Sequence, residues 1–216
     1  MSEATAPRPY SWLPVLLGVL TVATLSIGAI AFRYVENRMI ATAGETLAHT
    51  AAEVSDKLDR FLIERHGDVL MMARTFSVQP QNREFQSAYI AGVKIAYSDY
   101  IWIGATDAQG KIVVATDSST VGRDYSAEPW FQAVRNGQGV HMGDVEPFAV
   151  MGGPDSIAVS APITGPYGEF LGAVTTRVGI PGLEDVMTRT LLAFRQREGF
   201  WGALEYQFLT EKGIAF

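Results

Sequence analysis

The sequence predicts an α+β protein in which an N-terminal transmembrane helix and a long linker helix precede a five-stranded antiparallel sheet with flanking helices. Three observations support this prediction. Residues 9–32 contain no charged side chain. After them, apolar residues recur at spacings of four and three, the period of an amphipathic helix. From residue 100 onward the apolar period changes to two, which is typical of strands.

The apolar segment predicts a transmembrane helix over residues 13–33. The hydrocarbon core of a bilayer is about 30 Å thick and takes about 20 apolar residues in a helix. Gly18 and Gly28 weaken a soluble helix but are tolerated in a membrane. Trp12 and Tyr34 lie where interfacial aromatic side chains are expected. The lipid bilayer is therefore the first expected partner.

A cleaved secretory signal is the alternative to an anchor, because residues 29–31 (Ala-Ile-Ala) have the small-x-small pattern of a signal peptidase site. Signal peptides have apolar regions of about 7–15 residues, shorter than this one, so an uncleaved anchor is favoured. Arg8 on one side, against Arg33 and Arg38 on the other, does not decide the orientation. We place residues 1–12 in the cytoplasm, because so short a tail cannot fold, and the remaining chain outside the cell (inner) membrane.

Composition excludes several classes of site. The chain of 216 residues has no cysteine, which rules out disulfides, thiolate metal sites and a cysteine nucleophile. Its net charge of -6 argues against nucleic acid as a partner, because nucleic-acid binding needs a basic face. The length beyond the anchor is sufficient for one domain with attachments.

Residues 34–78 predict one long helix, which Pro80 ends. Its apolar stripe comprises Val35, Met39, Ala43, Leu47, Ala51, Val54, Leu58 and Phe61. The spacings of four and three from Leu47 to Phe61 also suit a heptad seam, which would pair two copies into a homodimer. The equal alternative is that the stripe packs on the chain's own domain. Both can hold for different stretches of the helix.

The globular part is expected to combine strands with short helices. A helix over residues 85–97 precedes the strands, and Pro129 opens another helix that Asn136 and Gly137 end. The expected strands cover residues 100–106, 111–116, 139–146, 157–163 and 170–178. Short turns join them into hairpins except across residues 118–136, so we expect an antiparallel sheet with helices on one face.

A second subdomain is expected to begin near the end of the sequence. Residues 181–199 predict a connecting helix, and residues 200–216 contain one strand, a turn and the start of another strand. A strand that ends just after its turn leaves unpaired backbone groups. We therefore expect the sequence to be a fragment, with residues 79–180 as its one complete subdomain.

Three stretches, taken in order, resemble a known family. They are residues 101–110 (IWIGATDAQG), residues 121–133 (VGRDYSAEPWFQA) and residues 160–174 (SAPITGPYGEFLGAV). The region from residue 35 onward resembles the double Cache sensor domain of bacterial sensor histidine kinases, chemoreceptors and diguanylate cyclases. The resemblance implies an extracytoplasmic ligand-binding unit with a PAS-like sheet, in which the membrane-distal subdomain holds a small-molecule ligand.

The resemblance also bears on the ligand. Family members that bind amino acids carry an arginine two residues before the tryptophan and a tyrosine directly after it, whereas this chain has Glu128 and Phe131. An arginine would bind a carboxylate through two hydrogen bonds, but Glu128 would repel one. An ordinary amino acid is therefore a poor expectation, and an amine suits the acidic residue better.

The predicted ligand-binding residues surround the expected Trp130 helix. Trp102, Tyr125, Trp130 and Asp144 are expected to line the pocket, and Arg123 with Asp124 forms the loop that closes it. Core packing is the alternative role for each aromatic residue, and a cap or turn is the alternative for Asp124. Asp144 and Glu146, two residues apart on a strand, share a face that either holds a cationic group or faces water.

The sequence offers little for catalysis. His49, His66 and His141 have no spacing typical of a metal site, and no cofactor motif is found. A ligand-sensing receptor module, probably too strong a word for proof but the leading reading, is preferred over a membrane-tethered enzyme, which would need a nucleophile, and over a passive scaffold, which would not need the long helix. Any kinase or cyclase activity would lie beyond Phe216.

Overall fold

The computed structural model describes residues 12–198. Internal contacts divide the chain into two compact units, Met1–Ala52 and Glu53–Phe216. The predicted cytoplasmic tail, apart from Trp12, and the predicted second subdomain lie outside the described residues. The strands and the candidate site all belong to the second unit.

Helix α1 runs without a break from Leu13 to Val78, so the predicted transmembrane and linker helices form one element. It ends two residues before Pro80, which cannot continue a helix. Its N-terminal segment is long and apolar enough to cross a membrane, a property that an anchor and a signal sequence share, and no part of that segment is buried. Along the predicted stripe, Leu47 is exposed, whereas Leu58 and Phe61 pack against the core of the second unit.

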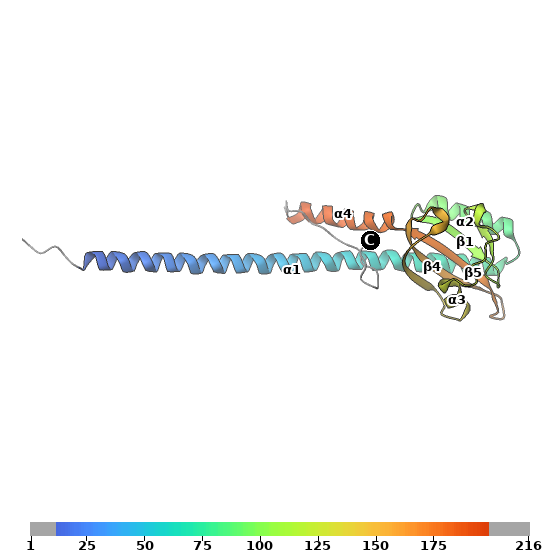
Figure 1. The fold of residues 1–216 in the computed structure, drawn as a ribbon, viewed down its shortest axis with the longest axis horizontal. Coiled ribbons are helices and arrows are strands. Elements are labelled where there is room, and N and C mark those ends of the chain that lie inside the picture. The colour runs from blue at the N-terminus through green and yellow to red at the C-terminus, as the bar shows by residue number, and fades with distance from the viewer. Residues whose placement is uncertain (1–11, 199–216) are drawn as a thin grey trace, which may run out of the picture. The chain divides into compact units, whose positions relative to one another are not determined.

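Five strands form one antiparallel sheet in the order β2-β1-β5-β4-β3 (Figure 1). They are β1 (Tyr100–Thr106), β2 (Ile112–Ala115), β3 (His141–Pro147), β4 (Asp155–Thr164) and β5 (Phe170–Gly179). All five predicted strands are therefore confirmed. Strands β2 and β3 lie at opposite edges, and the chain crosses between them through the short helices η1 (Ser118–Thr120) and α3 (Pro129–Arg135).

One face of the sheet packs against α1 and α2 (Arg83–Ala96), and we call it the α1 face. Its core joins helix residues Val69, Met72, Phe76 and Ile90 to strand residues Ile103, Val159, Val174 and Val178, all buried. Because side chains alternate along a strand, the intervening residues form the opposite face, which we call the α3 face. The strict alternation predicted for the β4 sequence accounts for this division.

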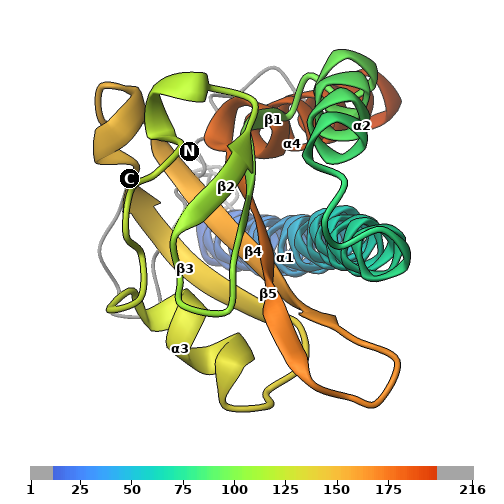
Figure 2. The ribbon, with the colours of Figure 1, turned by 90° about the vertical axis from the view of Figure 1, so that its right-hand side faces the viewer.

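Helix α3 corrects the expectation that all helices lie on one face. Trp130, Phe131 and Val134 pack against Ala173, the strand neighbour of Val174, and therefore on the opposite side of the sheet from α1. Figure 2 shows α1 and α2 on one side and α3 on the other. The sheet is sandwiched because both of its faces carry groups that require burial.

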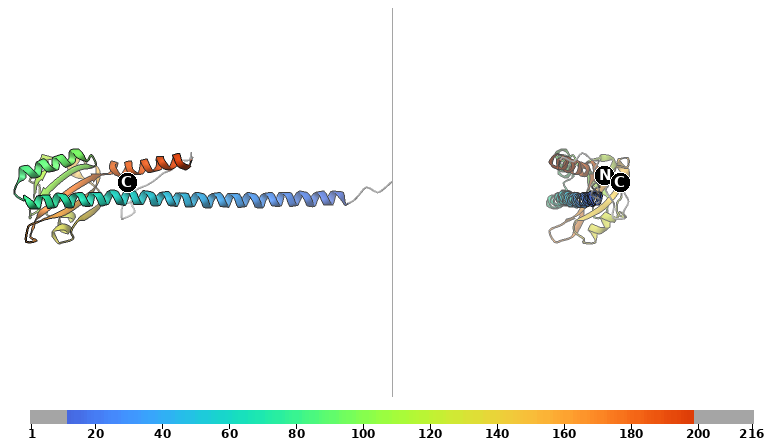
Figure 3. Two further views of the ribbon diagram at one scale, coloured as in Figure 1. Left: turned by 180° about the vertical axis from the view of Figure 1, so that it is seen from behind. Right: turned by 90° about the vertical axis from the view of Figure 1, so that its left-hand side faces the viewer.

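Helix α4 (Ile180–Glu198) follows β5 directly and lies beside the C-terminal part of α1, as Figures 1 and 3 show. Lys57 Nζ donates a hydrogen bond to Thr190 Oγ1 over 3.2 Å. The strand that ends in the sheet is thus connected to a helix that contacts α1.

Candidate functional site

The α3 face is small and polar at its centre. Ser156, Ser160 and Thr175 are fully buried there, and Ser160 Oγ donates to Thr175 Oγ1 over 2.8 Å. Gly104 pairs with Thr175 in the neighbouring strand. The α1 face has branched apolar side chains at the corresponding places, so only the α3 face offers hydrogen-bonding groups beneath a covering helix.

Trp102 forms the base of this face beside the small residues. Its side chain is 1% exposed, its Nε1 donates to Thr120 Oγ1 over 3.3 Å, and its ring lies 5.4 Å from the ring of Phe148. A Cβ on Gly104 would lie 2.3 Å from the indole, so the ring covers that glycine. Trp102 is held rigidly, as its alternative role in core packing requires.

Tyr125 and Trp130 lie next to each other, with ring centroids 6.1 Å apart. Tyr125 is half-buried and contacts both the Trp102 cluster and the Trp130 cluster. Burial raises the pKa of Tyr125, while the positive charges of Arg123 and Arg177 oppose that increase. Trp130 is 3% exposed, and its Nε1 has no acceptor within the described part of the chain. The predicted aromatic residues therefore do come together.

Arg123 and Asp124 lie at the exposed edge of this region. Asp124 Oδ1 accepts a hydrogen bond from Ser126 N over 2.8 Å, and this bond lowers the pKa of Asp124. The Arg123 carbonyl accepts from Ile112 N over 2.9 Å, and Asp124 bridges to Lys111. The described geometry gives Asp124 the turn role that was its alternative, and the loop is attached to β2 by its backbone.

Asp144 lies in a bulge of β3, where the register shifts between Met142 and Val145. It is exposed, and its Oδ1 accepts a hydrogen bond from Val145 N over 2.7 Å. The neighbouring acidic residue, Glu146, pairs with Ser156 of β4 and thus borders the α3 face. Glu146 is the nearer of the two carboxylates to the centre of the site.

Arg177 of β5 is the site residue that the sequence reasoning missed. It is 5% exposed and pairs with Trp102 on one side and Ala158 on the other. Its Nη1 donates to Glu146 Oε1 over 2.6 Å, and its guanidinium carbon lies 4.8 Å from the Phe148 ring centroid. An arginine within the apolar run of β5 was the available signal, because arginine is rarely buried without a partner.

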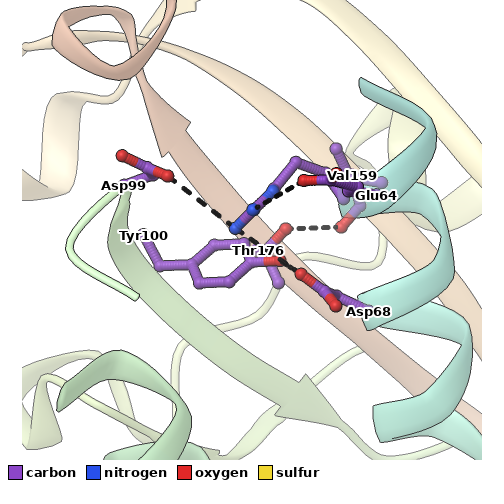
Figure 4. Close-up of polar contacts among 7 residues, drawn as sticks. Glu64, Asp68, Asp99, Tyr100, Val159 and Thr176 are labelled. Carbon is purple, nitrogen blue, oxygen red and sulfur yellow. Dashed lines mark hydrogen bonds and ion pairs between the residues drawn. The ribbon is translucent and has the colours of Figure 1, made fainter. Parts of the chain in front are cut away.

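A second polar cluster links α1 to the sheet on the α1 face (Figure 4). Tyr100 Oη donates to Asp68 Oδ2 over 2.7 Å. Arg65, 5% exposed, lies 3.5 Å from Asp68 and 3.9 Å from Asp99, and its guanidinium also lies over the Tyr100 ring. Its Nε and Nη1 have no hydrogen-bond acceptor among the described residues. Sequence reasoning did not identify this cluster, because its members are far apart in the chain.

Two hollows occur elsewhere on the second unit, and none of the predicted site residues lines either one. One, of about 240 Å³, lies between the start of α2 and the β1–β2 turn, with Arg83, Gln86 and Asp107 in its wall. The other, of about 470 Å³, lies between α1 and α4. Within residues 12–198, no group of three histidine, aspartate or glutamate side chains is arranged to hold a metal ion.

Comparisons of the sequence find no matching family model and no similar curated protein. Solved structures do match the fold. The sensor domain of the V. cholerae histidine kinase DctB matches with a TM-score of 0.52 at 14% identity, covering 63% of this chain and 56% of that one. The ligand-binding domain of the Pseudomonas fluorescens chemoreceptor CtaA in complex with L-serine gives 0.52 at 14%, covering 62% and 57%.

The ligand-binding domain of the Campylobacter jejuni chemoreceptor Tlp3, in complex with 4-methylisoleucine, matches with a TM-score of 0.55 at 10% identity, covering 62% of this chain and 57% of that one. These neighbours are Cache/PAS-like extracytoplasmic sensor domains, and this chain shares their fold. The chain spans a little over half the length of each of the three.

Proposed function

We propose that this chain is the membrane-anchored, extracytoplasmic ligand-sensing part of a bacterial signalling receptor, and specifically the N-terminal part of a sensor histidine kinase. The observation that carries the proposal is the α3 face, where buried polar groups of a sensor-type sheet lie beneath aromatic residues and include donors without acceptors. Fold neighbours from a histidine kinase and from ligand-bound chemoreceptors support it. A chemoreceptor or a diguanylate cyclase is the alternative output.

The ligand would lie between the sheet and the aromatic residues of the covering segment. Trp102 would form the base, while Tyr125 and Trp130 would contact the ligand from the side of α3. Arg123 and Asp124 would close the site from its edge, and Asp144 would lie at the rim. Aromatic walls with a few polar groups are the usual composition of a small-molecule site.

The signal would pass from the α3 face through the sheet to α1. Thr176 and Arg177 are neighbours on β5 but point to opposite faces, and Thr176 donates to the Val159 carbonyl on the α1 face. There the Arg65 cluster joins the sheet to α1, which is continuous with the apolar segment. A ligand that prefers one arrangement of these contacts would shift the population between two arrangements. Pairing of two copies along residues 47–61 would transmit that shift between protomers.

A thermal-shift screen of the full chain in detergent micelles against a metabolite library tests the proposal. A bound ligand at 100 times its Kd stabilises the folded state by about 2.7 kcal/mol. The shift should disappear in Tyr125→Ala but persist in Tyr167→Ala, because Tyr167 is 95% exposed in the β4–β5 turn. A library without a stabilising compound, or a shift unaffected by Tyr125→Ala, would contradict the proposed site.

The output class and the location need separate measurements. Reading the encoding gene past codon 216 would distinguish a kinase from a chemoreceptor or a cyclase. Protease protection in spheroplasts tests the topology, because the second unit should be digested from outside in an anchored, inner-membrane chain. Protection of the second unit would contradict the extracytoplasmic placement.

A further inference from the structure

Arg177 is a buried cation whose counter-ion is itself largely in water. The guanidinium is 5% exposed, whereas the side chain of its partner, Glu146, is 53% exposed. A guanidinium has five N–H donors in a planar fork, which fits a carboxylate best when two of them bind in parallel. The recorded contact to Glu146 is made through Nη1 alone. The pair therefore neutralises the charge without using the full donor set of the guanidinium.

Two further buried donors on the same face have no partner among the described residues. One is Ser156 Oγ, whose residue is fully buried, and the other is Trp130 Nε1. Ser156 is the direct cross-strand neighbour of Glu146, and it lies two positions along β4 from Ala158, the partner of Arg177. A buried donor without an acceptor is costly and calls for an explanation. These donors point to an acceptor-rich group that is supplied from outside the chain.

We infer that the ligand carries an acidic group, of the carboxylate class, which binds Arg177 and displaces Glu146 from it. The inference rests on the proposed function and specifies its ligand. Glu146 would serve as an internal counter-ion that keeps Arg177 neutralised in the empty site. Because Glu146 is half-exposed, it can move into water on release, while the buried Arg177 exchanges one carboxylate for another and is never left unpaired.

Glu128 favours an amine in the ligand, and the two requirements are separable. Glu128 is half-buried at the start of α3, and its charge acts on Tyr125. Arg177 lies across the site on β5. A molecule with both groups would satisfy both residues, whereas a simple carboxylate would satisfy Arg177 alone. Compounds with one group, both groups or neither group therefore distinguish the contributions.

The test is calorimetric titration of the full chain in nanodiscs with matched probes. The carboxylates are acetate, succinate and L-alanine; the neutral or amine-only counterparts are acetamide, succinamide, L-alaninamide and 1,4-diaminobutane. We expect at least one carboxylate to bind and its amide to bind at least about 30-fold more weakly, since a hydrogen bond to a charged group contributes about 2 kcal/mol. Glu146→Gln should tighten binding of that carboxylate about 10-fold, because the competing counter-ion is gone.

Variants separate this inference from the proposed function. Arg177→Gln should abolish carboxylate binding, and Arg177→Lys should restore part of it, whereas the control Arg189→Gln on exposed α4 should change nothing. If Arg177→Gln does not fold, the Glu146→Gln titration decides alone. Preference for the diamine or the amides, unchanged or weaker binding in Glu146→Gln, or no carboxylate binding in any chain would overturn the inference. The proposed function fails separately, if no compound of any charge stabilises the chain in the metabolite screen.

Discussion

Gly104→Ala tests whether Trp102 is as fixed as the structure indicates. The new Cβ would lie 2.3 Å from one indole carbon and 2.6 Å from another, well inside any van der Waals contact. The indole cannot move away freely, because it is 1% exposed, bonded to Thr120 and packed on Phe148. Overpacking costs about 1–3 kcal/mol, and loss of the indole hydrogen bond adds about 1 kcal/mol. We expect a destabilisation of about 2–4 kcal/mol.

Thermal unfolding of the full chain in detergent, followed by circular dichroism, measures this effect. For a unit of this size, a loss of about 3 kcal/mol lowers Tm by roughly 10 °C. Gly143→Ala is the matched control, because its Cβ would meet Ala158 Cβ at an ordinary 3.6 Å. Trp102→Phe in the Gly104→Ala background should recover part of the loss, since the smaller ring leaves room. Gly104→Ala within about 0.5 kcal/mol of wild type would refute the packing argument.

Three further outcomes follow from the hydrogen bonds. Tyr100→Phe should lower the free energy of unfolding by about 1–2 kcal/mol in urea titration, and adding Asp68→Asn should cost less than the sum of the two single effects; additivity would contradict a direct bond. Burial, and the hydrogen bond to Asp68, raise the pKa of Tyr100 above its ordinary value of about 10, so the unfolded state loses its proton first and stability should fall above pH 10, less steeply in Tyr100→Phe; equal slopes would contradict this. The depressed pKa of Asp124 means that its stabilisation is present above pH 4 and lost in acid; Asp124→Ala should lower Tm at pH 7 but not at pH 2, and Asp124→Asn, which keeps the acceptor for Ser126 N, should lose less, whereas a pH-independent difference would exclude the turn bond.

The strands were predictable because their signals are local. Ile157, Val159, Ala161 and Ile163 alternate with small or polar residues, and this period of two fixes both the strand and the face that each residue takes. The end of α1 before Pro80 is equally local. The position of α3 was not predictable in this way, since its apolar residues would suit either face of the sheet.

The candidate site was only partly predictable for the same reason. Trp102, Tyr125 and Trp130 were identified because aromatic residues near a short helix are visible in one dimension, and the structure brings their clusters together. Arg177 and Glu146 were not recognised as a pair, since they are far apart in the sequence and meet only through the β3–β4–β5 arrangement.

The sequence by itself determined the elements of this protein: the apolar segment, the long helix and five strands, because hydrophobic period and turn chemistry act over a few residues. Only the tertiary structure decided which charges are buried and what they face. Arg65 and Arg177 are ordinary cations in the sequence, and each acquires its role when strand pairing places it on one face of the sheet among partners that the chain order keeps apart.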